Sequence, residues 1–290
     1  MTLDARELEA DVEKHFADPD AAKGVRAKRK VVERLLDALE AGEVRAAERG
    51  DSGEWRAVPW VKRGILLGFR VGKLRDMSLY PPRVAGLHGF SFVDKDTFPP
   101  RRFSEKDNVR IVPGGSTIRR GAYVASGVVC MPPMYINVGA HVGTGTMVDS
   151  HALVGSCAQV GERVHLSAAA QVGGVLEPVN ASPVVIEDDV LVGGNCGVYE
   201  GTVVRKRAVL AAGVVLTRGT RVYDLVNEQL LAGSAERPLE IPEGAVVVPG
   251  ARSVTSPWGR EHGLSLQTPV IVKYRDEKTD LATALEQWLR

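Results

Sequence analysis

The stretch Tyr135-Ile-Asn-Val-Gly-Ala-His-Val-Gly-Thr-Gly-Thr-Met-Val148 carries an apolar residue at every sixth position, at Ile136, Val142 and Val148. The same step of six runs from Ile118 to Val172 and, after a break, from Ile186 to Val222. All 17 positions reached in this way are apolar. Because 44% of the chain is apolar, chance would fill 17 such positions about once in a million. The centre of the chain is therefore a repeat with a period of six.

A period of six fits neither the 3.6-residue period of a helix nor the two-residue alternation of a flat strand. It is typical of a parallel β-solenoid, in which a short strand and a corner together use six residues. Small residues follow many repeat positions, as in Val142-Gly143 and Val154-Gly155, where neighbouring coils approach closely. The pattern resembles the hexapeptide-repeat family, whose members wind three hexapeptides into each coil of a left-handed parallel β-helix. On that resemblance the repeats form about five or six coils.

The segment from Gly173 to Val185 interrupts the count of six. An insertion at a corner of a solenoid can project a loop toward a ligand or a neighbouring subunit. We therefore expect a loop at this point of the column.

Residues 1–108 lack the repeat and predict an α-rich domain. Leu8, Val12 and Phe16 lie at the spacing of one helical face. A second helix is expected to be capped by Asp20 and to end at Gly42. Its apolar stripe consists of Val31, Val32, Leu35, Leu36 and Leu39. Residues 50–53 (Gly-Asp-Ser-Gly) are typical of a hairpin turn.

Residues 60–70 predict another helix and residues 80–100, rich in Pro, Gly and aromatic residues, an irregular connection. Near the other end, residues 269–273 predict a strand. A short amphipathic helix that could cap the solenoid follows, with Leu281, Leu285 and Leu289 on one face. The chain is thus predicted to be mainly β, with an N-terminal helical domain (1–108), a left-handed β-helix domain (109–256) and a C-terminal strand and helix (257–290).

The composition excludes several classes of function. Lys and Arg total 37 and Asp and Glu 36, so a net charge of +1 gives no general attraction to nucleic acid or membrane. We interpret the basic run from Lys23 to Lys30 as a solvated helix face. No apolar run approaches the roughly 18 residues of a membrane span, and the N-terminus lacks the layout of a secretory signal.

The cysteines exclude two further classes of protein. Cys130, Cys157 and Cys196 are odd in number and contain no CxxC pair, which argues against a disulfide framework and a structural zinc site. We therefore expect a cytoplasmic protein without a bound metal, whose partners are neither nucleic acid nor membrane.

Two blocks, Gly145-Thr-Met-Val-Asp149 and Val154-Gly-Ser-Cys-Ala-Gln159, are far more specific than a generic hexapeptide. Further distinctive blocks are Arg110-Ile-Val-Pro113, Arg120-Gly-Ala-Tyr-Val124, Tyr135-Ile-Asn-Val-Gly-Ala140, Val164-His-Leu-Ser167, Gly173-Gly-Val-Leu-Glu-Pro178, Ile186-Glu-Asp188, Glu200-Gly201 and Val270-Ile-Val-Lys273. Together they resemble the bacterial tetrahydrodipicolinate N-succinyltransferase family. The resemblance covers nearly the whole chain and is strongest between residues 109 and 224.

The resemblance implies a homotrimeric, CoA-dependent N-acyltransferase of diaminopimelate and lysine biosynthesis. Its cosubstrate would be succinyl-CoA, lying in a groove between two adjacent solenoids, and no cofactor would be bound permanently. Its acceptor would be ring-opened tetrahydrodipicolinate, whose amine attacks the thioester directly. Such a site must bind a dicarboxylate, present a neutral amine and stabilise the tetrahedral oxyanion.

Asp149 matches the acidic residue that the family places against the acceptor's amino group. A carboxylate there can orient the ammonium and help to take its proton. Its reference pKa of about 3.9 makes it a weak base, so orientation carries more weight. Arg110 matches the family's substrate-binding arginine, and a guanidinium fork suits a bidentate contact with a carboxylate. The structural alternatives are a turn residue for Asp149 and a surface ion pair for Arg110.

One departure from the family concerns a second acidic residue beside the acceptor, three positions before the Glu-Gly pair. Here that pair is Glu200-Gly201, and the matching position is Gly197. The resemblance therefore does not carry a mechanism with two carboxylates onto this chain. Either Asp149 holds the amine alone, or Glu200 or another side chain substitutes.

For the CoA we expect contacts at Ser156, Gly174, Gly194 and Asn195, where small residues let the pantetheine reach the backbone. Coil packing is an equally good reason for these glycines. Cys157 lies inside a matched block and is expected to pack as a small apolar residue rather than to act as a nucleophile.

Four other interpretations stay open. His141, His151 and His165 are candidates for the histidine base of many hexapeptide acyltransferases, although a structural role is favoured for each. A zinc carbonic anhydrase of the same fold would use three histidines with an HxxxxH pair, and the spacings here are ten and fourteen. A solenoid can also be a scaffold without catalysis, and an enzyme of this family could use an acetyl rather than a succinyl donor.

Overall fold

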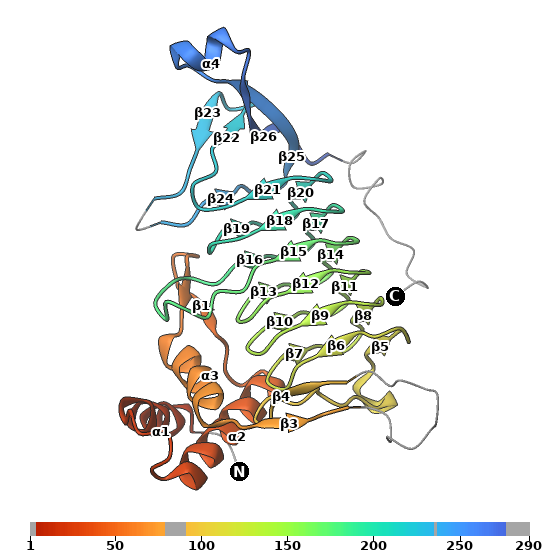
Figure 1. Ribbon diagram of the computed structural model, residues 1–290. Coiled ribbons are helices and arrows are strands. Elements are labelled where there is room, and N and C mark those ends of the chain that lie inside the picture. The colour runs from red at the N-terminus through yellow and green to blue at the C-terminus, as the bar shows by residue number, and fades with distance from the viewer. Residues whose placement is uncertain (1–3, 79–90, 235–236, 277–290) are drawn as a thin grey trace.

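A column of short parallel strands forms the centre of the computed structural model, which describes residues 4–78, 91–234 and 237–276 (Figure 1). Each six-residue unit makes a two-residue strand followed by a turn, and three parallel sheets run along the column. Each coil adds one strand to each sheet. The chain is a left-handed parallel β-helix flanked by an N-terminal helical part, which confirms the predicted fold.

The three sheets form the three faces of the column. The first face contains β7 (Tyr123–Val124), β10 (His141–Val142), β13 (Gln159–Val160), β16 (Val185–Ile186), β19 (Val203–Val204) and β24 (Glu240–Ile241). The second contains β5 (Arg110–Ile111), β8 (Val129–Cys130), β11 (Met147–Val148), β14 (His165–Leu166), β17 (Leu191–Val192) and β20 (Val209–Leu210). The third contains β6 (Thr117–Ile118), β9 (Tyr135–Ile136), β12 (Leu153–Val154), β15 (Gln171–Val172), β18 (Gly197–Val198) and β21 (Val215–Leu216).

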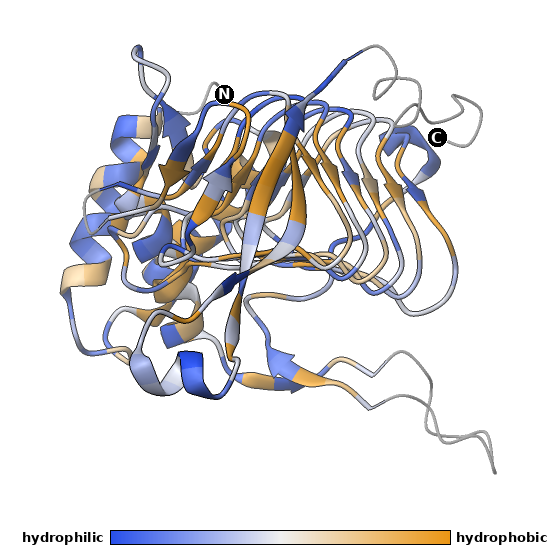
Figure 2. Cartoon of the chain, turned by 90° about the horizontal axis from the view of Figure 1, so that it is seen from above, coloured by the Kyte–Doolittle hydropathy of each residue, from blue (hydrophilic) through white to orange (hydrophobic). Residues whose placement is uncertain are grey.

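Successive coils stack in exact repeat register, so each apolar position meets its equivalent on the next coil. Val142 on β10 pairs with Val124 on one side and with Val160 on the other. Because successive residues of a strand point to opposite faces of the sheet, the second residue of each strand points inward. All 17 repeat positions are buried, with at most 6% of the residue exposed. In the view along the column, the apolar residues follow the strands (Figure 2).

The insertion lengthens one turn of the solenoid. Partners on neighbouring coils before the insertion are eighteen residues apart from Thr117 onward, as for Val142 and Val160, but Val160 pairs with Ile186. Part of the loop packs on the chain's own N-terminal domain, because Leu176 contacts the hydrophobic cluster of that domain. The buried ammonium of Lys62 also donates a hydrogen bond to the carbonyl of Ala181. The predicted loop is therefore present and docks on the N-terminal helices.

Three helices build the N-terminal domain, beside the first coils (Figure 1). They are α1 (Ala5–Ala17), α2 (Val25–Ala41) and α3 (Pro59–Val71). The short elements that follow or separate them are β1 (Ala47–Arg49), β2 (Trp55–Ala57), β3 (Leu74–Asp76), β4 (Val93–Lys95) and the 3₁₀-helix η1 (Glu105–Asp107). The predicted hairpin turn, the apolar stripe of α2 and its end at Gly42, in the left-handed conformation, are confirmed, and a helix is present at each of the three predicted places. The connection predicted to be irregular at 80–100 contains β4, which pairs with β3, and its residues 80–90 lie outside the described part of the chain.

The predicted start of α2 is wrong. Asp20 accepts hydrogen bonds from the N–H groups of Ala22 and Lys23, which forms a separate turn, and the helix begins only after Gly24. Asp20 therefore caps the turn that precedes α2 and does not cap the helix itself. Lys28 of the basic run also departs from a solvated face, because it is buried and pairs with Asp18 at 3.2 Å.

The N-terminal domain packs tightly on the solenoid. Val138 and Cys157, from two turns of the column, belong to the same hydrophobic cluster as the helices. Gly139 leaves room for Ile65 of α3, since a Cβ at that glycine would lie 2.8 Å from its Cδ1. The helices therefore bury their apolar face on one edge of the coils.

The C-terminal part extends the second face. β20 pairs with β25 (Ala245–Ser253), which runs antiparallel to β26 (Ser265–Tyr274), and β26 pairs with the hairpin of β22 (Val222–Asp224) and β23 (Gln229–Leu231). A short helix, α4 (Pro257–Glu261), connects the two long strands at the far end of the molecule (Figure 1). The strand predicted at 269–273 lies in β26, and the helix predicted from Leu281 to Leu289 lies outside the described residues.

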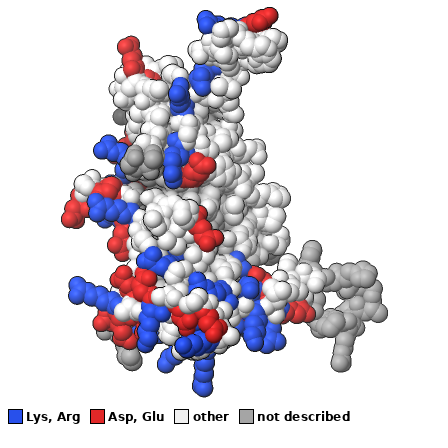
Figure 3. All heavy atoms as spheres, turned by 60° about the vertical axis from the view of Figure 1, so that its left-hand side comes forward, with Lys and Arg blue, Asp and Glu red and all other residues white. Residues whose placement is uncertain are grey.

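Charges are distributed unevenly on the surface. Lys, Arg, Asp and Glu side chains gather, with both signs mixed, over the N-terminal domain, whereas the adjoining flank of the coils is nearly uncharged in the view of Figure 3. No helix within residues 4–78, 91–234 and 237–276 has the length and apolar character needed to cross a membrane.

His141 should make the stability of this fold depend on pH. Burial, helped by the charge of Arg45, lowers the pKa of His141 to about 3, so the folded protein holds it neutral. An unfolded histidine titrates near pH 6.5, so its contribution to stability is complete above about that pH and is lost as the pH falls toward 3. Between pH 7 and 5.5 we expect the free energy of unfolding to fall by about 1 kcal/mol more in the wild type than in His141→Phe. Urea titrations at the two pH values measure this difference, and equal losses in both proteins would contradict it.

Candidate active site

The turns between the faces stack into edges, and two of these edges carry the predicted site residues. The Asp149 edge joins the second face to the third and comprises the turns 131–134, 149–152, 167–170, 193–196 and 211–214. The Ser156 edge joins the third face to the first and comprises the turns 119–122, 137–140, 155–158, 173–184 and 199–202. The third face lies between these two edges.

Asp149 begins its turn immediately after β11. Its Oδ1 accepts a hydrogen bond of 2.6 Å from the N–H of Ser150, and its Oδ2 lies 3.9 Å from Nε2 of His165. The side chain is 30% exposed, so the carboxylate is fixed by the turn and still open to a ligand. This arrangement suits a carboxylate that orients an ammonium group, because acceptor capacity remains on both oxygens.

Arg110 lies on the second face, which adjoins the Asp149 edge, but it is not beside Asp149. Arg110 occupies an outward position of β5, in the ladder that continues through Val129 and Met147 to His165. Two strand spacings, or roughly 10 Å, separate β5 from β11. Arg110 and Asp149 could therefore hold the two ends of one extended ligand, but they do not touch each other through this register.

The four residues predicted to contact CoA divide between the two edges. Ser156 and Gly174 are neighbours on the Ser156 edge, where the carbonyl of Ser156 accepts a hydrogen bond of 3.1 Å from the N–H of Val175. Gly194 and Asn195 lie on the Asp149 edge, two turns along from Asp149. Only the second pair therefore shares an edge with the predicted catalytic carboxylate.

Local geometry explains some of these residues without a ligand. Asn195 has φ +57°, like His151 (+62°) and Ala169 (+59°) at the same place in neighbouring turns, and asparagine tolerates this left-handed conformation well. A Cβ at Gly174 would lie 2.5 Å from the backbone nitrogen of Ser156, so coil packing requires glycine there. At Gly194 the nearest atom would be 3.3 Å away, which leaves its backbone more accessible.

Gly197 occupies an outward position of β18 on the third face, and the ring of Tyr199 lies over it. A Cβ at Gly197 would be 2.4 Å from Cε2 of Tyr199 and 2.9 Å from its hydroxyl oxygen. The same ring covers Gly173 on the neighbouring coil, where a Cβ would meet Cδ1 at 2.7 Å. An aromatic side chain thus fills the space in which the resemblance placed a second acid.

The three histidines considered as bases lie apart. His141 belongs to the first face, His165 to the second, and His151 to a turn of the Asp149 edge. Among the described residues, no three His, Cys, Asp or Glu side chains are grouped as ligands for a metal ion. His151 shares the turn of Asp149, whereas His165 is the one of the three with a ring nitrogen within 4.0 Å of the Asp149 carboxylate. The proximity of His165 follows from the eighteen-residue step that places it beside Met147.

Cys157 is completely buried in the cluster between the solenoid and the N-terminal helices. Burial raises the pKa of its thiol to about 12, so no thiolate forms near neutral pH. The structure therefore agrees with a packing role and not with a nucleophile. All three cysteines are buried free thiols.

Comparison with known proteins places this geometry in a family. Residues 7–71 match the family model of the tetrahydrodipicolinate N-succinyltransferase N-terminal domain, and residues 183–218 match that of the hexapeptide repeat of succinyl-transferase. A 2,3,4,5-tetrahydropyridine-2,6-dicarboxylate N-succinyltransferase of Bradyrhizobium diazoefficiens is 42% identical over 267 residues, covering 90% of each chain. One of the same name from a Chelativorans species is 39% identical over 291 residues, covering 100% of this chain and 99% of the relative.

A solved structure supports the fold independently. It is described as a putative 2,3,4,5-tetrahydropyridine-2-carboxylate N-succinyltransferase from Campylobacter jejuni and has a TM-score of 0.52. The similarity covers 88% of this chain and 64% of the other, at 18% sequence identity. Since relatives of about 40% identity span nearly its whole length, the chain belongs to the tetrahydrodipicolinate N-succinyltransferase family of hexapeptide-repeat acyltransferases.

Proposed function

We propose that this chain transfers the succinyl group of succinyl-CoA to the amino group of ring-opened tetrahydrodipicolinate, a step of diaminopimelate and lysine biosynthesis. The observation that carries the proposal is the full-length match to the Chelativorans enzyme, which includes the N-terminal domain as well as the repeats. The match of generic coils alone would favour acyl transfer of any kind. The match of the N-terminal domain favours the reaction of this one family over other acyl transfers.

In the proposed reaction the amine nitrogen attacks the thioester carbonyl, the C–S bond breaks and CoA leaves as the thiol. Asp149 accepts a hydrogen bond from the acceptor's ammonium, holds it toward the thioester and passes its first proton to water. The second proton, lost from nitrogen as the amide forms, goes to the leaving thiolate. Arg110 binds one carboxylate of the acceptor through its guanidinium fork. Their separation of about two strand spacings, roughly 10 Å, suits the two ends of an extended dicarboxylate.

Asp149 carries the amine alone in this proposal. Gly197 provides no side chain, and the ring of Tyr199 fills the adjacent space. Glu200 lies on the other edge, where its Oε2 accepts a hydrogen bond of 3.2 Å from the N–H of Arg218. Neither Gly197 nor Glu200 therefore supplies a second carboxylate beside the amine.

The proposed CoA contacts suggest how the subunits cooperate. Gly194 and Asn195 share the edge of Asp149, whereas Ser156 and Gly174 lie across the third face. A groove between two solenoids would bring the Asp149 edge of one chain toward the Ser156 edge of another. The outward positions of the third face carry no charged side chain and are suited to such packing, namely Thr117, Tyr135, Leu153, Gln171, Gly197 and Val215.

We therefore propose a homotrimer, and its mass in solution tests the arrangement. Light scattering coupled to gel filtration should give about three times the 31.2 kDa of one chain. A fully active enzyme of single-chain mass would contradict a site shared between subunits. Cytoplasmic localisation is also part of the proposal, since three buried free thiols fit a reducing compartment.

Donor choice tests the succinyl part of the proposal. At saturating L-2-aminopimelate we expect kcat/KM to be at least about 10-fold higher with succinyl-CoA than with acetyl-CoA, because an unpaired site for the distal carboxylate penalises the shorter donor. Steady-state rates of thiol release with each donor measure this ratio. A preference for acetyl-CoA would contradict the proposed succinyl donor and would leave the proposed acceptor unchanged.

A further inference from the structure

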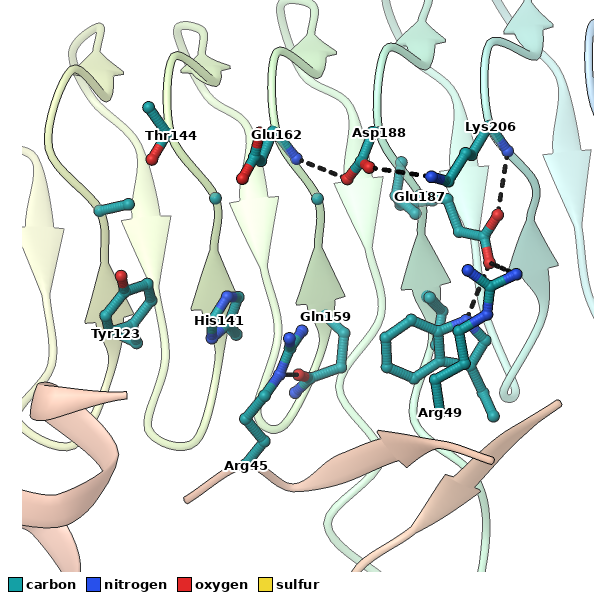
Figure 4. Close-up of a pocket in the computed structure, with 16 residues that line it drawn as sticks. Arg45, Arg49, Tyr123, His141, Thr144, Gln159, Glu162, Glu187, Asp188 and Lys206 are labelled. Atoms are coloured by element: carbon teal, nitrogen blue, oxygen red, sulfur yellow. Dashed lines mark hydrogen bonds and ion pairs between the residues drawn. The ribbon is translucent and has the colours of Figure 1, made fainter. Parts of the chain in front are cut away.

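A second cavity lies on the first face, away from the Asp149 edge. It has a volume of about 350 Å³ and lies between the strands of that face and the hairpin of β1 and β2 (Figure 4). Tyr123, His141 and Gln159 lie side by side on three consecutive strands of its floor, and Arg45 reaches Gln159 from the hairpin. The acyl-transfer proposal uses none of these side chains.

Arg45 is the unusual residue of this cavity. Its side chain is largely buried, and its Nε donates a hydrogen bond of 2.9 Å to Oε1 of Gln159. The guanidinium carbon lies 5.5 Å from the centre of the Trp55 ring. Within the described part of the chain, no carboxylate lies within 4.0 Å of this guanidinium, whereas Arg49 of the same hairpin has Glu187 at 3.8 Å. A partly buried cation with no carboxylate in contact gains from an anion that can reach it.

The acids that line the cavity already have their own partners. Glu187 accepts hydrogen bonds from the indole of Trp55 and the guanidinium of Arg205, both at 3.0 Å. Asp188 lies 3.4 Å from the ammonium of Lys206, and Glu162 pairs outside the cavity with Arg163 at 2.7 Å. Asp188 and Glu48 act on the charge of Arg45 only from a distance, so among these groups Arg45 is the cation without a carboxylate in direct contact.

A second polar group points to the same conclusion. Nδ1 of His141 is buried and has no hydrogen-bond partner. The imidazole stacks on the ring of Tyr123, with centroids 4.3 Å apart and 17° between the planes. Because a neutral imidazole can carry its proton on either nitrogen, a ring N–H of His141 can serve as a donor to a ligand that displaces its present surroundings. The floor therefore combines an aromatic surface with a donor and a nearby cation.

We propose that this cavity binds a small organic carboxylate with a planar apolar body. Its carboxylate would pair with the guanidinium of Arg45 and accept a hydrogen bond from His141. Its body would lie against the rings of Tyr123, His141 and Trp55, since aromatic rings favour offset stacking. Charge-assisted pairing and an apolar wall in a cavity of this size are typical of small-molecule sites.

The test uses isothermal titration calorimetry on the full-length protein with benzoate as the probe. We expect one benzoate per chain, and weaker binding of both acetate, which lacks the ring, and inorganic phosphate, which lacks any apolar body. The variant Arg45→Gln should weaken benzoate binding by about 10- to 100-fold, the effect of losing a charge-assisted hydrogen bond. His141→Phe keeps a ring on Tyr123 and removes Nδ1, and should weaken it by about 2- to 10-fold.

Arg56→Gln is the matched control, because it removes an equal charge from the adjoining hairpin, at an exposed arginine that pairs with Glu54 and does not line the cavity. We expect this variant to bind benzoate within about two-fold of the wild type. Thermal melting of each variant verifies that it is folded. Absence of benzoate binding, phosphate binding as tight as benzoate, or equal losses in Arg45→Gln and Arg56→Gln would overturn the proposal. Because acyl transfer is measured separately, these outcomes are independent of the proposed reaction.

Discussion

Replacing Asp149 by asparagine is expected to lower the kcat of acyl transfer by about 100-fold or more. Asparagine keeps the size of the side chain and can still accept the hydrogen bond from the N–H of Ser150. It loses the negative charge that holds the ammonium and helps to draw off its proton. The loss should fall mainly on kcat, because Arg110 still binds the acceptor. Thiol release at saturating succinyl-CoA and acceptor measures it.

Glu200→Gln is the control for this prediction. Glu200 lies on the Ser156 edge, in a left-handed turn position, and its carboxylate caps the N–H of Arg218. We expect turnover within about two-fold of the wild type, since a glutamine oxygen can accept the same hydrogen bond. If Asp149→Asn retained near-normal turnover while Glu200→Gln abolished it, the carboxylate that acts on the amine would be Glu200.

Gly155→Ala is expected to cause the largest loss of stability. A Cβ at Gly155 would lie 2.1 Å from the backbone nitrogen of Gly174 and 2.5 Å from its Cα. Both atoms belong to the backbone of the next coil, so no side chain can turn away and relieve the contact. Overpacking in a dense core costs about 1–3 kcal/mol, and here the upper end of that range or more is expected. Urea unfolding followed by circular dichroism measures the change.

Gly219→Ala provides the matched comparison. A Cβ at Gly219 would meet no atom within 4 Å, and its φ lies outside the left-handed region. We expect its free energy of unfolding to stay within about 0.5 kcal/mol of the wild type. Equal losses of unfolding free energy in the two variants would contradict the close approach of the Gly155 and Gly174 backbones.

The repeat predicted the column because a narrow solenoid allows only one inward position per strand. Every sixth residue from Ile118 to Val222, outside the insertion, is buried, so period and burial carry the same information. Helix boundaries were less well determined. An aspartate caps turns as well as helices, and the residues next to Asp20 do not distinguish the two. The predicted start of α2 therefore lies too early in the chain.

Less of the candidate site could be predicted. The resemblance indicated Asp149 and Arg110, and the structure places both on the second face or its edge. The proximity of His165 to Asp149 follows from the eighteen-residue coil and could have been found by counting. The ring of Tyr199 over Gly197 depends on a rotamer, which the pattern does not encode.

The cavity at Arg45 could not be predicted at all from the repeat. Arg45 and Gln159 are 114 residues apart, and they meet only because the N-terminal hairpin docks on the first face. Nothing in the local sequence of either residue indicates this contact. The sequence period predicts which residues point into the solenoid, but it does not predict which elements pack against the outer side of its faces.

The central claim is that this chain acylates a specific amine, and thiol release from succinyl-CoA with and without acceptor tests it most directly. With L-2-aminopimelate or tetrahydrodipicolinate present, we expect release that rises and saturates with acceptor, together with one equivalent of N-succinylated product. Without acceptor, release should remain at the background rate, because no covalent acyl-enzyme is formed. Equal release in both conditions, or none in either, would contradict the proposed function.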